Sequence, residues 1–130
     1  MARRLVARNG QRYLSPRGVV ARLVSEFPSV TSSEEEGRRY VRGLIERLLA
    51  IRQSGDIPID NEYLERLTRA ESGAIYVYFE DWSSTNVHLG MVVIPGEPLF
   101  FTYTSGAQEQ ATHPLLVRCA KVLDYEIVDA

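Results

Sequence analysis

The spacing of apolar residues in the first half of the chain predicts amphipathic helices. From Val41 to Leu49, apolar side chains recur every three or four residues, which is the spacing of one helix face. Ser33 and Glu36 form a capping-box pattern ahead of this segment. In that pattern the serine hydroxyl accepts from the glutamate amide, and the glutamate carboxylate reaches back to the serine amide. The helix is expected to end near Gly55 and to bury one face.

Two shorter helices are predicted on either side of this one. Ser15 and Pro16 have the residue types of an N-cap and a first helical position, and Pro28 ends the apolar stripe that follows them. Asp60 is the expected N-cap of the other helix, and Gly73 stands where a C-terminal glycine would end it.

Beyond Gly73 the apolar pattern changes to the period of two that is typical of strands. Three segments are rich in aromatic and β-branched residues and are separated by short polar links: Ala74–Phe79, Val87–Ile94 and Leu99–Thr104. Consecutive strands with short links form antiparallel meanders. A helix over 114–123, with Cys119 in its apolar stripe, and a strand over 125–128 are expected to follow.

The alternation predicts apolar side chains on both faces of this sheet. Ile75, Val77 and Phe79 share one face, whereas Tyr76 and Tyr78 share the other. Further aromatic residues occupy positions 100, 101 and 103. A sheet that is apolar on both faces needs cover on both, so helices or another subunit are expected to cover the second face.

The beginning of the chain predicts a β-hairpin. Asn9-Gly10 favours the positive φ angles of a type I′ turn, and the residues at 4–8 and 11–14 flank it. The predicted fold is therefore α+β, with an N-terminal hairpin and helices packed on a C-terminal antiparallel sheet of three or more strands.

The composition indicates an ordinary globular chain. A length of 130 residues with 45% hydrophobic side chains suits one domain with one core, and neither disorder nor a fibrous repeat fits it. We therefore expect a single domain over residues 1–130. It would consist of a basic hairpin arm at 1–14, a helical half at 15–72 and a sheet-rich half at 73–130.

Charge is distributed unevenly along the chain. Residues 1–22 hold six arginines and no acid, whereas the remainder holds nine basic side chains and all 17 acids, giving formal charges of +6 and −8 that sum to −2. One hypothesis is that the hairpin places Arg4, Arg8 and Arg12 along a nucleic-acid backbone, with Tyr13 stacking on a base. The other is that the arginines pair with the acidic remainder of the same molecule.

The number of cysteines and the length of the apolar runs indicate where in the cell the protein is expected. A single cysteine excludes an intramolecular disulfide and a cysteine-based zinc site, and it fits a reducing environment. The apolar runs are far shorter than the roughly 20 residues that span a bilayer. No apolar stretch follows the first residues, so export is not indicated. The expected location is the cytoplasm, without membrane contact.

The link between the first two predicted strands holds the densest group of reactive side chains. Glu80, Asp81 and His88 have the residue types of an acid–base group or a divalent-cation site. The same residue types also satisfy the backbone of an exposed turn between strands. Trp82, in the same link, either folds back onto the sheet or meets a partner. Phosphate-binding and dinucleotide-binding fingerprints are absent, and the two histidines are far apart, so no cofactor and no metal are expected.

The two-sided apolar sheet and the lack of a convergent catalytic set favour a non-enzymatic function. The leading hypothesis is a small regulatory or interaction module that binds a protein partner or self-associates, with a homodimer as the simplest form. The alternative is a nucleic-acid-binding regulator that uses the arginine-rich N-terminal hairpin. A third hypothesis is a hydrolase or lyase around Glu80, Asp81 and His88. The residues expected to bind a partner are Arg4, Arg8, Arg12, Tyr13 and Trp82.

Overall fold

Helices and antiparallel strands are interspersed along the described chain, which comprises residues 3–80, 89–102 and 108–129 of a computed structural model. In chain order the elements are β1 (Arg3–Ala7), α1 (Pro16–Glu26), β2 (Thr31–Ser33), α2 (Glu34–Ser54), α3 (Asn61–Ala70), the 3-10 turn η1 (Glu71–Gly73), β3 (Ile75–Tyr78), β4 (Gly90–Val93), β5 (Phe100–Thr102), α4 (Gln108–Leu123) and β6 (Tyr125–Asp129). This arrangement confirms the predicted α+β class with an antiparallel sheet. Among the described residues, no helix is both long and apolar enough to cross a bilayer.

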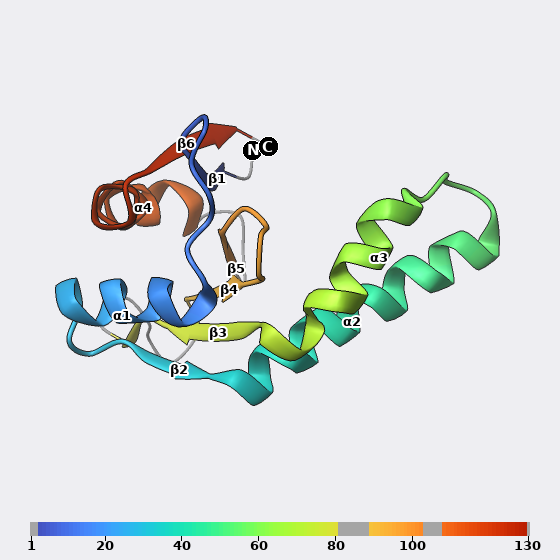
Figure 1. Ribbon diagram of the computed structural model, residues 1–130, viewed down its shortest axis with the longest axis horizontal. Coiled ribbons are helices and arrows are strands. Elements are labelled where there is room, and N and C mark those ends of the chain that lie inside the picture. The colour runs from blue at the N-terminus through green and yellow to red at the C-terminus, as the bar shows by residue number, and fades with distance from the viewer. Residues whose placement is uncertain (1–2, 81–88, 103–107, 130) are drawn as a thin grey trace.

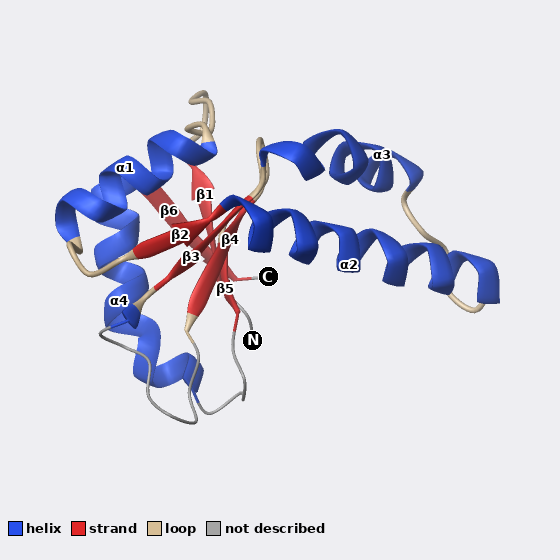
Figure 2. Ribbon diagram, turned by 90° about the horizontal axis from the view of Figure 1, so that it is seen from below, coloured by secondary structure: helices blue, strands red, loops and turns tan. Residues whose placement is uncertain are grey.

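The strands form two antiparallel sheets that meet at one pair of residues. One sheet has four strands in the order β2-β3-β4-β5, and the other pairs β1 with β6. The Leu5 amide donates to the Leu99 carbonyl at 2.8 Å, and the Leu99 amide donates back to the Leu5 carbonyl at 2.9 Å. β1 therefore lies beside the start of β5, and Figure 2 shows the strands fanning out between the helices.

The N-terminal hairpin prediction is wrong about the partner of β1. Asn9-Gly10 does form a turn, with Gly10 at φ 82°. Residues 11–14 are not a strand, however, and β1 pairs instead with β6, with Leu5 opposite Ile127. β6 packs on α4, so this pairing places Leu5 in the core. A local turn signal does not decide strand pairing where a distant strand offers more burial.

α1 and α4 cover one face of the four-stranded sheet, which we call the inner face (Figure 1). Ser15 caps α1 as predicted by accepting from the Gly18 amide at 3.1 Å, and the helix ends before Pro28. The buried residues of this core come from both helices and from inward-facing strand positions: Leu5, Val19, Leu23, Phe27, Val77, Phe79, Leu89, Met91, Val93, Leu99, Phe101, Leu115, Leu116, Cys119 and Leu123. Cys119 is thus a core residue, as its place in an apolar stripe predicts.

α2 and α3 form a helical hairpin that projects from the rest of the molecule (Figures 1 and 2). The Ser33 hydroxyl accepts from the Glu36 amide at 3.1 Å, which confirms half of the predicted capping box. The Glu36 carboxylate, however, is bonded to Arg39 at 3.0 Å. Two predicted limits are confirmed, because α2 ends at Gly55 with φ 75° and Asp60 caps α3. The predicted end of α3 at Gly73 is wrong, because α3 ends at Ala70 and Gly73 closes the 3-10 turn η1 instead.

The base of this hairpin covers part of the opposite, outer face of the sheet. A second buried cluster forms there from Val41, Ile45, Leu64, Leu67, Ala74, Val92 and Ile94. α2 lies directly against the residues that lead into β3 at Gly37, where an added Cβ atom would lie 2.4 Å from the Ala74 carbonyl oxygen. Helices of the same chain therefore cover this part of the outer face, which is one of the two kinds of cover that the sequence predicts.

With one exception, the remaining elements differ from the predictions in length rather than in kind. β3, β4 and β5 lie within the three predicted strand segments. α4 begins at Gln108, ahead of Pro114, although a proline removes one helical hydrogen bond. The sequence pattern does not predict β2, because its three residues are polar and show no apolar alternation. Its pairing with β3, in which Thr31 lies opposite Tyr78, is what makes it a strand.

Candidate functional site

Acidic residues at the end of the chain hold two of the N-terminal arginines. The Arg8 guanidinium is bonded to Asp124 at 2.9 Å and lies 3.5 Å from Glu126. Arg3 lies 3.5 Å from Asp129 and also contacts the His113 ring. The pairing of β1 with β6 thus brings opposite charges together, as the second charge hypothesis expects. These pairs are solvent-exposed, so each contributes little to stability.

The other residues of the predicted N-terminal binding set have different surroundings. Tyr13 is partly buried against the inner core, and its ring meets that of Tyr125 edge to face with centroids 5.7 Å apart. Arg4 and Arg12 are exposed. The predicted set is therefore split between a paired arginine, a packed tyrosine and two exposed arginines.

The predicted acid–base group is only partly within the described chain. Asp81, Trp82 and His88 lie outside the described residues, whereas Glu80 is described and exposed. In the ranges 3–80, 89–102 and 108–129, no group of three or more potential metal-ligating side chains occurs. Cys119 is fully buried, and burial raises the pKa of its thiol to about 12, so the thiol stays protonated near neutral pH.

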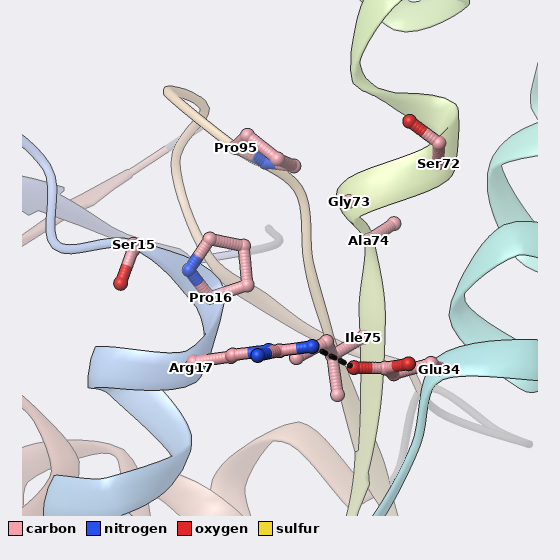
Figure 3. Close-up of a pocket in the computed structure, with 9 residues that line it drawn as sticks. All are labelled: Ser15, Pro16, Arg17, Glu34, Ser72, Gly73, Ala74, Ile75 and Pro95. Atoms are coloured by element: carbon pink, nitrogen blue, oxygen red, sulfur yellow. Dashed lines mark hydrogen bonds and ion pairs between the residues drawn. The ribbon is translucent and has the colours of Figure 1, made fainter.

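A cleft of about 280 Å³ lies beside the first residues of α1 and α2 (Figure 3). Arg17 reaches across it to donate to the Glu34 carboxylate at 3.2 Å, and Pro95 lines the other side. The two charged side chains are 84% and 54% exposed. Because they compensate each other in water, this cleft offers a ligand no strong electrostatic attraction.

Five aromatic side chains lie close to one another on the outer face, and we call them the aromatic strip: Tyr40, Tyr63, Tyr76, Tyr78 and Phe100. Ring centroids are 4.7 Å apart for Tyr76 and Tyr78, 6.2 Å for Tyr40 and Tyr76, and 6.3 Å for Tyr40 and Phe100. All five rings are only partly buried. Folding therefore leaves a contiguous aromatic surface beside the second buried cluster.

Strand register and one glycine position the centre of the strip. Tyr76 and Tyr78 share a strand face, and Tyr78 lies opposite Gly90 on the next strand. The Tyr76 ring lies over Gly90, since an added Cβ atom there would be 2.3 Å from the ring. The Tyr76 hydroxyl is hydrogen-bonded to the hydroxyl of Thr102 on β5. The missing side chain at Gly90 thus lets Tyr76 reach across the sheet.

One end of the strip is a depression of about 300 Å³, which we call the tyrosine pocket. It is lined by Glu36, Arg39, Tyr40, Tyr76 and Tyr78. Burial raises the pKa of Tyr78, and the nearby carboxylates of Glu36 and Glu80 raise it further. Burial also raises the pKa of Tyr40. Both tyrosines therefore stay neutral at physiological pH and present ring faces and hydroxyl groups.

The other end of the strip lies between α3 and the turn from β4 to β5. Tyr63, Phe100 and Arg4 line a cavity of about 480 Å³ there. Arg66 donates to the Glu97 carboxylate at 2.8 Å, and its guanidinium lies 5.5 Å from the centre of the Tyr63 ring. This end therefore combines aromatic surface with two arginines, of which Arg66 is compensated by Glu97 and Arg4 is exposed.

The strip cannot be read from the sequence pattern alone. The alternation in β3 places Tyr76 and Tyr78 on one face, but Tyr40 and Tyr63 come from helices whose position on the sheet is a tertiary property. The local signal is a pair of tyrosines two residues apart in a strand that has a glycine opposite on its neighbour. That signal points to two of the five residues of the strip, Tyr76 and Tyr78.

Comparisons with known proteins do not identify the site. No protein-family model matches the chain, and no curated protein and no solved structure matches it either. Function must therefore be inferred from the geometry of the chain itself.

Proposed function

We propose that the protein is a non-enzymatic interaction module that binds another protein through the aromatic strip. The observation that carries this proposal is a group of partly buried rings on the outer face: Tyr40, Tyr76, Tyr78 and Phe100 are neighbours, and Tyr63 lines a cavity together with Phe100. Tyrosine is enriched at the energetic centres of interfaces, because its rigid ring offers a large apolar area and its hydroxyl remains a polar contact.

The shape of the molecule supports the same use. Tyr40 and Tyr63 come from the projecting hairpin, whereas the other three rings come from the sheet, so the strip spans two elements. Figure 1 shows the hairpin at an angle to the sheet. A partner seated on the strip would contact both elements. Stable interfaces bury about 800 Å² on each partner, so the strip would form the centre of a larger contact.

The charges beside the strip favour a protein over a nucleic acid as the ligand. Of the three arginines that line the two ends of the strip, two are bonded to carboxylates: Arg39 to Glu35 and Glu36, and Arg66 to Glu97. A phosphate backbone binds best to guanidinium groups that are not already neutralised by carboxylates. A mixed surface of aromatic and compensated polar groups is typical of protein interfaces.

The two alternative functions have less support. Arg8, on which the nucleic-acid hypothesis partly depends, is bonded to Asp124. Of the residues on which the enzymatic hypothesis depends, Glu80 alone lies within the described chain, where it is exposed.

Site-specific photocrosslinking tests the proposal. A photoreactive phenylalanine analogue replaces Tyr63 in the strip and, as a matched control, Val117, which is 44% exposed on α4. Irradiation of cells that produce the protein is expected to give a discrete adduct from position 63 and none of equal yield from position 117. The mass of the adduct distinguishes a second copy of the chain from a different protein.

A second substitution ties the adduct to the strip. Tyr78→Ser in the position-63 variant is expected to lower the adduct yield by about tenfold if Tyr78 is a hot spot. Val24→Ser, at a 42% exposed position on α1, is expected to leave the yield unchanged. Circular dichroism checks that both variants are folded. The absence of an adduct from position 63, or the same adduct from both positions, would refute the proposed function.

A further inference from the structure

Three aromatic rings and a carboxylate converge at the tyrosine pocket. Tyr40 comes from α2, and Tyr76 and Tyr78 come from β3. In each neighbouring pair of these rings the planes are inclined by 48°. Inclined rings present aromatic faces on more than one side of the pocket, and the face of an aromatic ring carries negative electrostatic potential that attracts cations.

Among the described side chains, three carboxylates and two guanidinium groups line this pocket or lie near it. Glu36 lines it, and Glu80 lies close enough to raise the pKa of a pocket tyrosine. Glu35 adjoins it through its bond to Arg39. The two guanidinium groups are those of Arg39, which lines the pocket, and Arg47, which lies near Tyr40. These five side chains together carry a formal charge of −1.

Arg39 already brings a guanidinium group to the rim of the pocket. Its Nη1 atom donates to Glu36 at 3.0 Å and its Nη2 atom donates to Glu35 at 2.9 Å, while the side chain is 67% exposed. Exposed ion pairs of this kind are weak. A second cation can therefore share or displace this contact.

We propose that the tyrosine pocket binds the positively charged side chain of a lysine or arginine on the protein partner. The rings of Tyr40, Tyr76 and Tyr78 would surround the cation, and the Glu36 carboxylate would be its counter-ion. The apolar stem of such a side chain matches the rings, because it can lie along them while its charge remains near water. This inference rests on the proposed function and specifies the group that the partner inserts at one end of the strip.

An NMR titration of the full chain with two small probes tests the inference. Nα-acetyl-lysine methylamide carries the ammonium group, and the corresponding norleucine derivative has nearly the same alkyl chain without the charge. The lysine probe is expected to cause saturable shifts of the Tyr40, Tyr76 and Tyr78 ring signals. The norleucine probe is expected to bind roughly two- to fivefold more weakly, the ratio that a cation–π contact at an exposed site gives.

Charge substitutions separate the effect of the carboxylate from that of the rings. Glu36→Gln is expected to weaken lysine binding, whereas Arg39→Gln is expected to strengthen it by about threefold, because Glu36 loses its competing guanidinium. Glu97→Gln, at the other end of the strip, is the matched control and is expected to change nothing at the pocket.

Three results would overturn the inference: no saturable shift with lysine, equal affinity for lysine and norleucine, or weaker lysine binding by Arg39→Gln. Its failure is distinguishable from failure of the proposed function. An adduct from position 63 without a lysine preference would leave the interaction surface in place and refute only the cation pocket. Lysine binding without any adduct would support the cation pocket and refute the proposed interaction surface.

Discussion

Gly37 and Gly90 each make room for a neighbour on the outer face. At Gly37 the neighbour is the backbone of Ala74, which lets α2 lie directly on the sheet. At Gly90 it is the ring of Tyr76, whose hydroxyl is then bonded to Thr102. A tyrosine ring can rotate away from an added methyl group, but a packed backbone cannot. The first glycine is therefore needed for the fold, and the second for the position of one ring in the strip.

Gly37→Ala is expected to lower the free energy of unfolding by about 1–3 kcal/mol, the usual cost of overpacking. The new Cβ atom would lie 2.4 Å from the Ala74 carbonyl oxygen. Gly43→Ala in the same helix is the matched control, because nothing lies within 4 Å of its added Cβ atom. That change is expected to raise the free energy of unfolding by up to about 1 kcal/mol. Urea denaturation followed by circular dichroism measures both, and equal effects would contradict the close approach at Gly37.

The hairpin of α2 and α3 stands out at the scale of elements, because it projects beyond the sheet (Figure 1). Leu49 and Ile57 in its distal part are 39% and 60% exposed. Helical segments with little tertiary cover depend more on their caps, since tertiary packing is the main source of helical stability elsewhere. The caps at Ser33 and Asp60 therefore help to hold the helices that carry Tyr40 and Tyr63.

Ser33→Ala is expected to lower the free energy of unfolding by about 1 kcal/mol, the usual effect of removing an N-cap. The change removes the bond from the Glu36 amide to the Ser33 hydroxyl at 3.1 Å. Ser32→Ala is the matched control, because Ser32 is exposed and precedes the cap. Amide hydrogen exchange should show faster exchange in the first turn of α2 for Ser33→Ala alone. Unchanged exchange there would mean that the cap contributes nothing to the hairpin.

At the scale of the whole molecule, the two ends of the chain meet in the pair of β1 and β6 (Figure 1). This pair explains the charge asymmetry along the sequence in part, because Arg3 and Arg8 lie against acids at the other end of the chain. It also completes the inner core, since Leu5 and Tyr125 are buried with residues of α1 and α4. Burial should outweigh the ion pairs in holding the two ends together.

Leu5→Ala is expected to lower the free energy of unfolding by about 2–5 kcal/mol, the range for truncating a buried leucine. Leu5 is fully buried, at 0% exposure. Arg8→Ala removes the exposed bond to Asp124 at 2.9 Å and is expected to change stability little. Urea denaturation at low and high salt measures both variants. A larger effect for Arg8→Ala, or a strong salt dependence of the unsubstituted protein, would show that the charges hold the two ends.

Local rules acting within a few residues determined much of the fold from the sequence. The caps at Ser15, Ser33 and Asp60 and the end of α2 at Gly55 are where the pattern predicts them, because capping depends on neighbours within one turn. The strands β3 to β5 follow from alternation, which likewise needs no distant partner. The short polar strand β2 has no such local signal and escaped prediction.

The sequence by itself therefore determined the helices, the meander and the apolar character of both sheet faces. The tertiary structure alone decided that β1 pairs with β6, and it alone brought Tyr40 and Tyr63 beside the aromatic residues of the sheet. The physical reason is the same in both cases. Pairing between distant strands and packing of a helix on a sheet depend on which arrangement buries the most surface, and that quantity belongs to the whole chain rather than to any segment.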